Sequence, residues 1–351
     1  MQYKIGITLL TSILFLSACA GIGSGIPDWV NGKSSAYPDT KYLTGKGQDT
    51  HQNVARDRAR ADLAKIFEVA ITEKSHDEVS YKSNTLDQIK NTQLDTSNTR
   101  QITSHTDQII SGIEISETWQ DKTSGQYHAL ATVDRAKMST RLRSIINQLD
   151  DKTAQAIRQA RQKSDPFDQL GLASIALQSQ IEREPYQKQL QIVNYNGTGL
   201  NSPYDITTLL NDRNALLKRL KIHARLIQDP NNDTNSHGLA QSQIINLEKT
   251  IKGAVASAGF TDASNKDADY ILNVDLKIDK NKDPQGWYWQ KGLLEIVLQE
   301  QADNKILGSK QWLIKESSQD EKMSEKRVLD KINTLLQTEL RETLIGFGSA
   351  N

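Results

Sequence analysis

The sequence contains a single cysteine, Cys19, among its 351 residues. One cysteine excludes an internal disulfide and a cluster of thiolates around a metal. The 43 basic and 43 acidic residues balance, which argues against nucleic acid as a partner, because binding it needs a basic patch or stripe. No apolar run reaches the about 20 residues that a membrane-spanning helix needs. The length and the 36% of hydrophobic residues are typical of a rather polar globular chain with two or more domains.

Motifs for catalysis are equally scarce. The six histidines show no pair at metal-ligand spacing, and no Gly-x-Ser-x-Gly motif supplies a hydrolase nucleophile. Gly45-Lys46-Gly47 lacks the spacing of a phosphate-binding loop, so we interpret it as a turn or bulge in a strand. The sequence therefore predicts a protein that is not an enzyme and that binds no metal or cofactor.

The N-terminus carries the most informative pattern. Lys4 precedes an apolar stretch from Ile5 to Leu16, and the run ends in Leu16-Ser17-Ala18-Cys19. A basic head, a short apolar segment and small residues at a cleavage position predict an export signal over residues 1–18. An ordinary signal peptide with an incidental cysteine is the alternative.

Leu-Ser-Ala-Cys resembles the bacterial lipobox. The resemblance implies that Cys19 receives a diacylglycerol on its thiol and, after cleavage, an N-acyl chain such as palmitate. Several acyl chains on one residue give stable membrane anchoring. Ala20 follows the cysteine instead of aspartate, and by resemblance to lipoprotein sorting signals this implies the outer membrane, with the chain on its periplasmic face.

After the signal peptide, residues 19–26 are predicted to form a flexible tether, and residues 27–149 an N-terminal α+β domain. A strand at 42–47 is expected to precede a helix in which the small residues Ala55 and Ala59 allow close approach to a sheet. Alternating apolar residues predict a further strand at 67–72. The polar segment 75–106 is left open between a long helix, a projecting hairpin and a loop. A hairpin is expected over 113–133, with its turn at 121–125.

The remainder divides into a spacer and a second α+β domain. Residues 150–220 predict three or four short helices, with Asp165 capping a helix that begins at Pro166 and breaks at Pro185 and at 196–199. Residues 221–351 predict a strand, a helix, alternating strands near 270–278, 287–299 and 306–314, and a closing amphipathic helix. The expected fold class is α+β: two small antiparallel-sheet-plus-helix domains joined by a helical spacer.

Residues 19–149 contain several short motifs in a fixed order. They are Cys19, Pro27-Asp28-Trp29-Val30, Tyr42-Leu43-Thr44-Gly45-Lys46-Gly47, the Ala55–Ala59 helix, Gly112-Ile113-Glu114-Ile115, Trp119, Tyr127-His128-Ala129-Leu130-Ala131 and Asp134-Arg135. This order resembles the twenty-kilodalton outer-membrane lipoprotein antigen family (LPP-type), also seen in flagellar outer-membrane lipoproteins. Residues 220–346 are similar in pattern to the CsgG/TolB/LpoB-type periplasmic domain. These resemblances imply envelope assembly or regulation without catalysis.

One aromatic cluster, Trp287-Tyr288-Trp289, is a candidate interaction surface. In a strand, Trp287 and Trp289 point to one face and Tyr288 to the other. Either these rings anchor a partner, or they pack in the core against the last helix near Trp312. The sequence therefore predicts an outer-membrane lipoprotein that binds an unknown envelope protein, with a homo-oligomer as a further possibility. The alternative is a regulator of a peptidoglycan synthase, for which the tether is too short to provide the reach.

Overall fold

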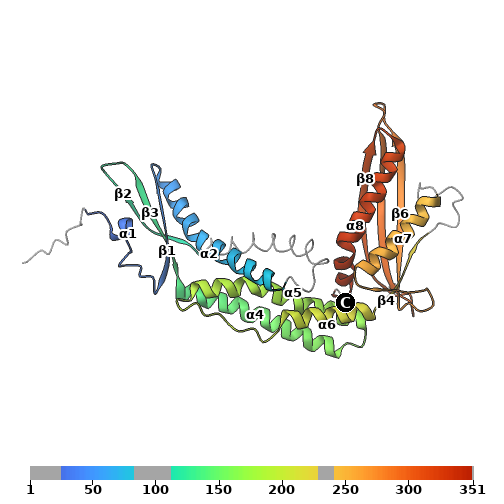
Figure 1. Ribbon diagram of the computed structural model, residues 1–351, viewed down its shortest axis with the longest axis horizontal. Helices are drawn as coiled ribbons and strands as arrows, with labels where there is room; N and C mark the ends of the chain where they lie inside the picture. Colours follow the sequence, from blue (N-terminus) through green and yellow to red (C-terminus); the bar gives the residue numbers. More distant parts are fainter. Residues whose placement is uncertain (1–24, 83–111, 228–240, 350–351) are drawn as a thin grey trace, which may run out of the picture.

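The computed structural model describes residues 25–82, 112–227 and 241–349. The described residues form seven helices and two sheets, in an α+β arrangement. A three-stranded sheet and a five-stranded sheet lie at opposite ends of a layer of long helices (Figure 1). The α+β fold class expected from the sequence is confirmed.

The N-terminal sheet contains β1 (Tyr42–Asp49), β2 (Glu114–Gln120) and β3 (Tyr127–Asp134) in the antiparallel order β1-β3-β2. β2 and β3 form the expected hairpin, whose turn contains Gly125 at φ +74°. In the short helix α1 (Asp28–Asn31), Trp29 is buried and its Nε1 donates to Oε2 of Glu117 at 2.5 Å. This bond attaches the segment before β1 to the hairpin.

The helix α2 (Gln52–Lys82) packs unusually closely on β1 because each element presents its smallest residues. A Cβ atom on Gly47 would lie 2.2 Å from the carbonyl oxygen of Ala55, and one on Gly45 would lie 2.6 Å from that of Ala59. Both alanines are fully buried. The expected turn or bulge at Gly45-Lys46-Gly47 is therefore wrong: β1 pairs with β3 in regular register there, and the glycines make room for helix backbone.

The strand expected at 67–72 is also wrong, since these residues belong to α2. Phe67 continues the four-residue spacing of Ala55, Ala59 and Leu63, and all four are buried. This helical stripe outweighs the short apolar alternation that followed it. Of the polar segment 75–106, residues 75–82 continue α2, and residues 83–106 lie outside the described residues.

Three helices fill the middle of the chain: α4 (Arg135–Gln162), α5 (Pro166–Val193) and α6 (Ile206–Arg219). Asp134 and Asp165 cap α4 and α5 by accepting from the backbone N–H groups of Lys137 and Phe167. With 28 residues each, α4 and α5 are about 42 Å long. The number of helices agrees with the expected three or four, but only α6, with 14 residues, is short.

The helix break expected at Pro185 is wrong, because Pro185 lies inside α5. A proline in a helix loses one backbone hydrogen bond and crowds the preceding turn. Here the neighbouring residues Arg183, Tyr186, Gln189 and Leu190 are all buried. Their packing holds the helix on both sides of the proline.

The C-terminal sheet contains β4 (Lys221–Leu226), β5 (Thr261–Asp262), β6 (Tyr270–Lys282), β7 (Tyr288–Glu300) and β8 (Ile306–Ser318), in the order β5-β4-β6-β7-β8. It differs from the expected antiparallel sheet because β4 pairs in parallel with both β5 and β6. The helix α7 (Gln241–Ser257) connects β4 to these strands, and a crossover helix of this kind brings the next strand back in the same direction. The sheet is therefore mixed.

The helices α7 and α8 (Glu321–Ser349) cover one face of this sheet (Figure 1). The core beneath them includes Phe167 and Leu170 from the start of α5, whereas Tyr186, Leu190 and Val193 from the end of α5 belong to the N-terminal core. One helix thus contributes to both cores. The expected boundary between residues 149 and 150 falls inside α4, and the division into separately folding domains stays a prediction.

Candidate functional site

The aromatic cluster lies at the end of the five-stranded sheet, around the turn between β6 and β7. Trp287 is 37% exposed and precedes β7. The Nε1 of Trp289 donates to Oδ2 of Asp283 at 2.9 Å, and the backbone N–H of Trp287 donates to Oδ1. The bond from Trp289 and those from backbone N–H groups hold the pKa of Asp283 below its ordinary value. Asp283 therefore fixes the positions of both tryptophans.

Trp289 lies on the sheet face opposite α7 and α8. In β7, Gln290, Leu294, Ile296 and Leu298 are buried under the helices, and Trp289 has the opposite parity. Trp312 is the tryptophan that packs against the last helix, with its Nε1 donating to Oε2 of Glu339 at 2.7 Å. Tyr288 has the parity of the helix-covered face and accepts from Nζ of Lys282 at 2.9 Å.

Two lysines flank the ring of Trp289. The Nζ atoms of Lys291 and Lys315 lie 5.4 Å and 5.5 Å from its centroid, within reach of a cation–π interaction. Lys291 and Lys315 are register partners on β7 and β8. The other register partner of Lys291 is Asp279 on β6, so this end of the open face combines an aromatic ring with two lysines and one neighbouring carboxylate.

Next to the lysines lies an apolar pair that sequence reasoning missed. Leu313 on β8 is 83% exposed, and its register partner Leu293 on β7 is half-buried. We call Trp289, Lys291, Leu293, Leu313 and Lys315 the open-face patch. In the sequence, the patch was indicated only by the position of Leu313 between Trp312 and Ile314. Because these two neighbours are buried on the helix-covered face, Leu313 points to the opposite face. Such a signal indicates a site only once the helices are known to cover the other face.

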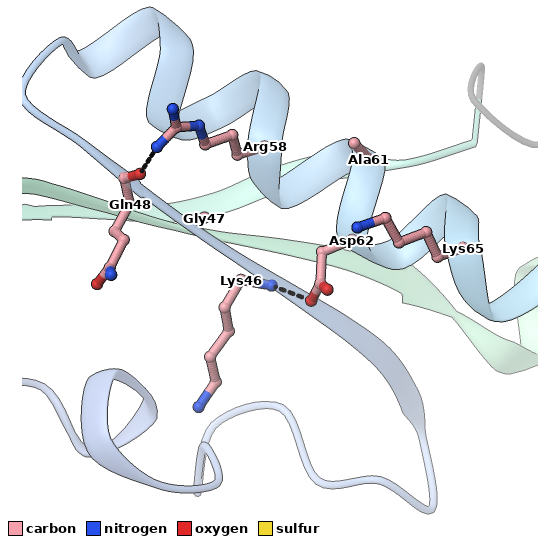
Figure 2. Close-up of a pocket in the computed structure, with 7 residues that line it drawn as sticks. All are labelled: Lys46, Gly47, Gln48, Arg58, Ala61, Asp62 and Lys65. Carbon is pink, nitrogen blue, oxygen red and sulfur yellow. Dashed lines mark hydrogen bonds between the residues drawn. The ribbon is translucent and has the colours of Figure 1, made fainter.

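A second surface feature is a hollow of about 400 Å³ between β1 and α2 (Figure 2). Lys46, Arg58 and Lys65 bring positive charge to it, but two of these cations already have partners. The Nη1 of Arg58 donates to the carbonyl oxygen of Gln48 and pairs with Asp49 at 2.9 Å. The Nζ of Lys46 donates to the carbonyl oxygen of Gly32, while its backbone N–H donates to Asp62 at 3.0 Å. Asp49 thus balances the charge of Arg58, whereas Lys46 is bonded to a neutral carbonyl oxygen and keeps its positive charge.

Within 25–82, 112–227 and 241–349, no group of three or more His, Cys, Asp or Glu side chains is placed to hold a metal ion. No helix in this described part is both long and apolar enough to cross a membrane. The predicted lipid-attachment residue, Cys19, lies outside the described residues.

The comparison with family models gives a match over the N-terminal sheet and its helix. Residues 27–134 match the LPP20 lipoprotein family. This segment contains α1, the glycines of β1, α2 and the β2–β3 hairpin. The match agrees with the landmarks that suggested a lipoprotein family, and it covers less than half of the chain. No curated protein matches the sequence.

Solved structures with weak similarity include a secreted protein and a minor lipoprotein. The secreted protein HP1454 from Helicobacter pylori is 14% identical, with a TM-score of 0.37, over 84% of this chain and 96% of that one. A minor lipoprotein from Acinetobacter baumannii is 13% identical, with a TM-score of 0.25, over 36% and 91%. Protein XCC0632 from Xanthomonas campestris is 16% identical, with a TM-score of 0.28, over 37% and 87%. Similarity at this level supports no argument about function, and the resemblance of residues 220–346 to CsgG/TolB/LpoB-type domains stays a prediction.

Proposed function

We propose that this protein is a lipoprotein anchored in the outer membrane through Cys19, facing the periplasm and acting by binding another envelope protein. The observation that carries the proposal is the LPP20 lipoprotein match, which begins eight residues after the cysteine of a lipobox-like sequence. The role is one in envelope assembly or structure, without catalysis. Lipid on Cys19 is the only cofactor-like group that the proposal requires.

The anchor and the open-face patch lie in different parts of the chain. A tether of residues 19–26 keeps the N-terminal sheet close to the membrane, because so short a linker spans little distance. The five-stranded sheet lies at the other end of the α4–α5 layer (Figure 1). The proposal therefore assigns anchoring to the N-terminal part and partner binding to the C-terminal sheet.

The chemistry of the open-face patch indicates what kind of partner it would bind. Leu313 and Leu293 offer an apolar contact, and Trp289 adds an aromatic ring of the type that anchors interfaces. Lys291 and Lys315 lie beside one another across the strands. A protein surface with an apolar side chain bordered by carboxylates complements this arrangement in shape and charge.

Site-specific photo-crosslinking in cells tests partner binding. A photoreactive amino acid replacing Leu313 is expected to give a light-dependent adduct with one envelope protein. The matched control replaces Lys326, which is exposed on α8 on the other side of the sheet. Equal adducts from both positions, or none from position 313, would contradict the proposal.

One observation favours the alternative function, regulation of a peptidoglycan synthase. The tether alone is too short to reach such a partner, but α4 and α5 together extend the chain by about 42 Å. The identity of the crosslinked protein separates the two functions. A synthase as the adduct would support the regulator, and a structural or assembly component would support the first proposal.

A further inference from the structure

A hollow of about 300 Å³ lies where α8 meets the helices of the middle layer. Lys152 from α4, Ser174 and Gln178 from α5, Arg213 from α6 and Glu342 from α8 line it. Four helices from two parts of the chain therefore share one cavity. Its volume is at the lower end of the range found for small-molecule sites.

Arg213 is the most informative residue in this cavity. Its Nε atom is buried and has no hydrogen-bond partner among the described residues. The Nε of the neighbouring Arg341 is likewise buried without a partner, although its Nη2 donates to Oδ1 of Asn214 at 3.2 Å. Buried donors of charged groups are costly unless they are paired. Arg213 thus lines the cavity with an unused Nε donor, and the second unused Nε, that of Arg341, lies nearby without lining it.

The charges around the cavity do not balance. Burial, followed by the positive charge of Arg341, lowers the pKa of Arg213 to about 10, and Glu342 opposes this shift. Burial also lowers the pKa of Arg341. At neutral pH both arginines remain charged, and Lys152 is a further cation among the lining residues. Glu342 is the single carboxylate among the lining residues.

The apolar lining residues of the cavity restrict which anion would pair with the arginines. Ile175 and Leu177 of α5 and Ile345 of α8 give the cavity apolar surface next to the cations. A guanidinium pairs best with an oxyanion that accepts two hydrogen bonds, such as a phosphate or a carboxylate. A bare inorganic ion would leave the apolar walls uncovered, whereas an anion with a short hydrocarbon part would contact both surfaces.

We propose that this cavity is a binding site for a small organic oxyanion, a phosphate monoester or carboxylate, which pairs with Arg213 and lies against Ile175 and Ile345. Bound there, the anion would join α4, α5 and α6 to α8. The middle helices and the C-terminal sheet would then be held together by a ligand as well as by their own packing.

The test is a thermal melt and a calorimetric titration of the full mature chain with hexyl phosphate, hexanoate and inorganic phosphate. We expect hexyl phosphate or hexanoate to raise the melting temperature, with a weaker effect of inorganic phosphate. Arg213→Gln is expected to reduce the affinity by about tenfold or more, the cost of losing a charged hydrogen-bond partner. Glu342→Gln is expected to bind the anion more tightly, because it removes the only lining carboxylate.

Arg219→Gln is the matched control, since Arg219 is exposed on the same helix, α6, outside the cavity. It is expected to bind the anions as the unmodified chain does. An unchanged affinity in Arg213→Gln, or no binding of any of the three probes, would overturn the proposal. Equal affinity for inorganic phosphate and hexyl phosphate would refute the role of the apolar walls.

The same chemistry also occurs in a phospholipid headgroup, and flotation with vesicles separates the two sources. Arg213-dependent flotation with vesicles containing phosphatidylglycerol, but not with pure phosphatidylcholine, would assign the site to a headgroup. Arg213-dependent binding of hexyl phosphate without flotation would assign it to a free small molecule. The chain used in these assays begins at position 19 and carries Cys19→Ser, so that neither the signal peptide nor a lipid anchor contributes to flotation.

Discussion

The hydroxyl of Tyr270 donates a 2.7 Å hydrogen bond to Oδ1 of Asp165, 105 positions earlier in the chain. The same carboxylate oxygen accepts from the backbone N–H of Phe167 and so caps α5. The rings of Phe167 and Tyr270 also lie in contact, with centroids 5.1 Å apart. One carboxylate therefore begins a spacer helix and attaches it to the first residue of β6.

This relationship predicts a stability that decreases in alkali. Burial, and then the bond to Asp165, raise the pKa of Tyr270 above its ordinary value of 10. The folded protein therefore keeps the proton more strongly than the unfolded chain, so the stabilisation is complete below pH 10 and is lost as the pH rises above it. Tyr270→Phe should cost about 1 to 2 kcal/mol at pH 8.

Urea unfolding at pH 8 and pH 11 measures this effect. The difference in unfolding free energy between the unmodified chain and Tyr270→Phe should shrink at pH 11, because only the unmodified chain loses the contribution of Tyr270. A difference that is the same at both pH values would contradict the role assigned to this hydrogen bond.

A buried ion pair joins the two long helices. The Nε of Arg183 lies 2.9 Å from Oδ1 of Asp150, and the Arg183 side chain is 1% exposed. Its Nη2 also donates to the carbonyl oxygen of Leu200 at 3.0 Å. Asp150→Ala should destabilise the protein by about 3 kcal/mol, because it leaves a buried cation without its carboxylate.

Chemical denaturation of Asp150→Ala and of the double variant Asp150→Leu/Arg183→Met checks this. The double variant removes both charges and should recover most of the lost stability, since apolar replacements of a buried pair are often neutral. If the double variant were as unstable as Asp150→Ala, the loss would come from packing and the ion pair would not be its cause.

The glycines of β1 give a prediction about helix–strand packing. Gly47→Ala would bring Cβ within 2.2 Å of the carbonyl oxygen of Ala55, and backbone at that distance must move. Overpacking of this kind should cost about 2 to 3 kcal/mol. Gly253→Ala is the matched control, because Gly253 lies inside α7 and an added Cβ would meet nothing within 4 Å beyond its chain neighbours and the backbone of its own helix. It should stabilise the protein by about 0.5 to 1 kcal/mol. Melting temperatures that moved in the same direction would contradict this account of the glycines.

The sequence predicted local structure well where one residue type determines it. Asp165 was expected to cap a helix that begins at Pro166, and its side chain accepts from the backbone N–H of Phe167. Pro185 was misleading because buried neighbours hold α5 across the proline. The parallel pairing of β4 was not visible, since it depends on which strands meet after α7 crosses the sheet.

The candidate site could be predicted only in part. Trp289 was identified by its aromatic ring, but Leu313 was not, because an exposed leucine has the same sequence pattern as a buried one until the uncovered face is known. Arg213, whose Nε lacks a hydrogen-bond partner among the described residues, was equally invisible. Its environment is built by residues from α4, α5 and α8 that are far apart in the sequence.

The two faces of the C-terminal sheet should respond differently to the same substitution. Leu272 is fully buried on β6, and Leu313 is 83% exposed on β8. Leu272→Asp should destabilise the protein by about 3 kcal/mol or more, because it buries an unpaired charge. Leu313→Asp should change the stability by less than about 0.5 kcal/mol. Thermal melts of the variants measure this difference in stability. Lys277→Asp, at an exposed position of β6, is a second variant whose stability is expected to be nearly unchanged. A large loss from Leu313→Asp would mean that this face is covered.

The measurement closest to the central proposal is fatty-acid labelling with membrane fractionation of the unmodified chain and of Cys19→Ser. The unmodified chain should incorporate labelled palmitate and sediment with the outer membrane on a density gradient. Cys19→Ser should lose the label and remain uncleaved or leave the outer membrane, because it lacks the thiol that receives the diacylglycerol. Unchanged labelling of Cys19→Ser, or an unmodified chain that is unlabelled and free in the periplasm, would contradict the proposal that this protein acts as an anchored lipoprotein.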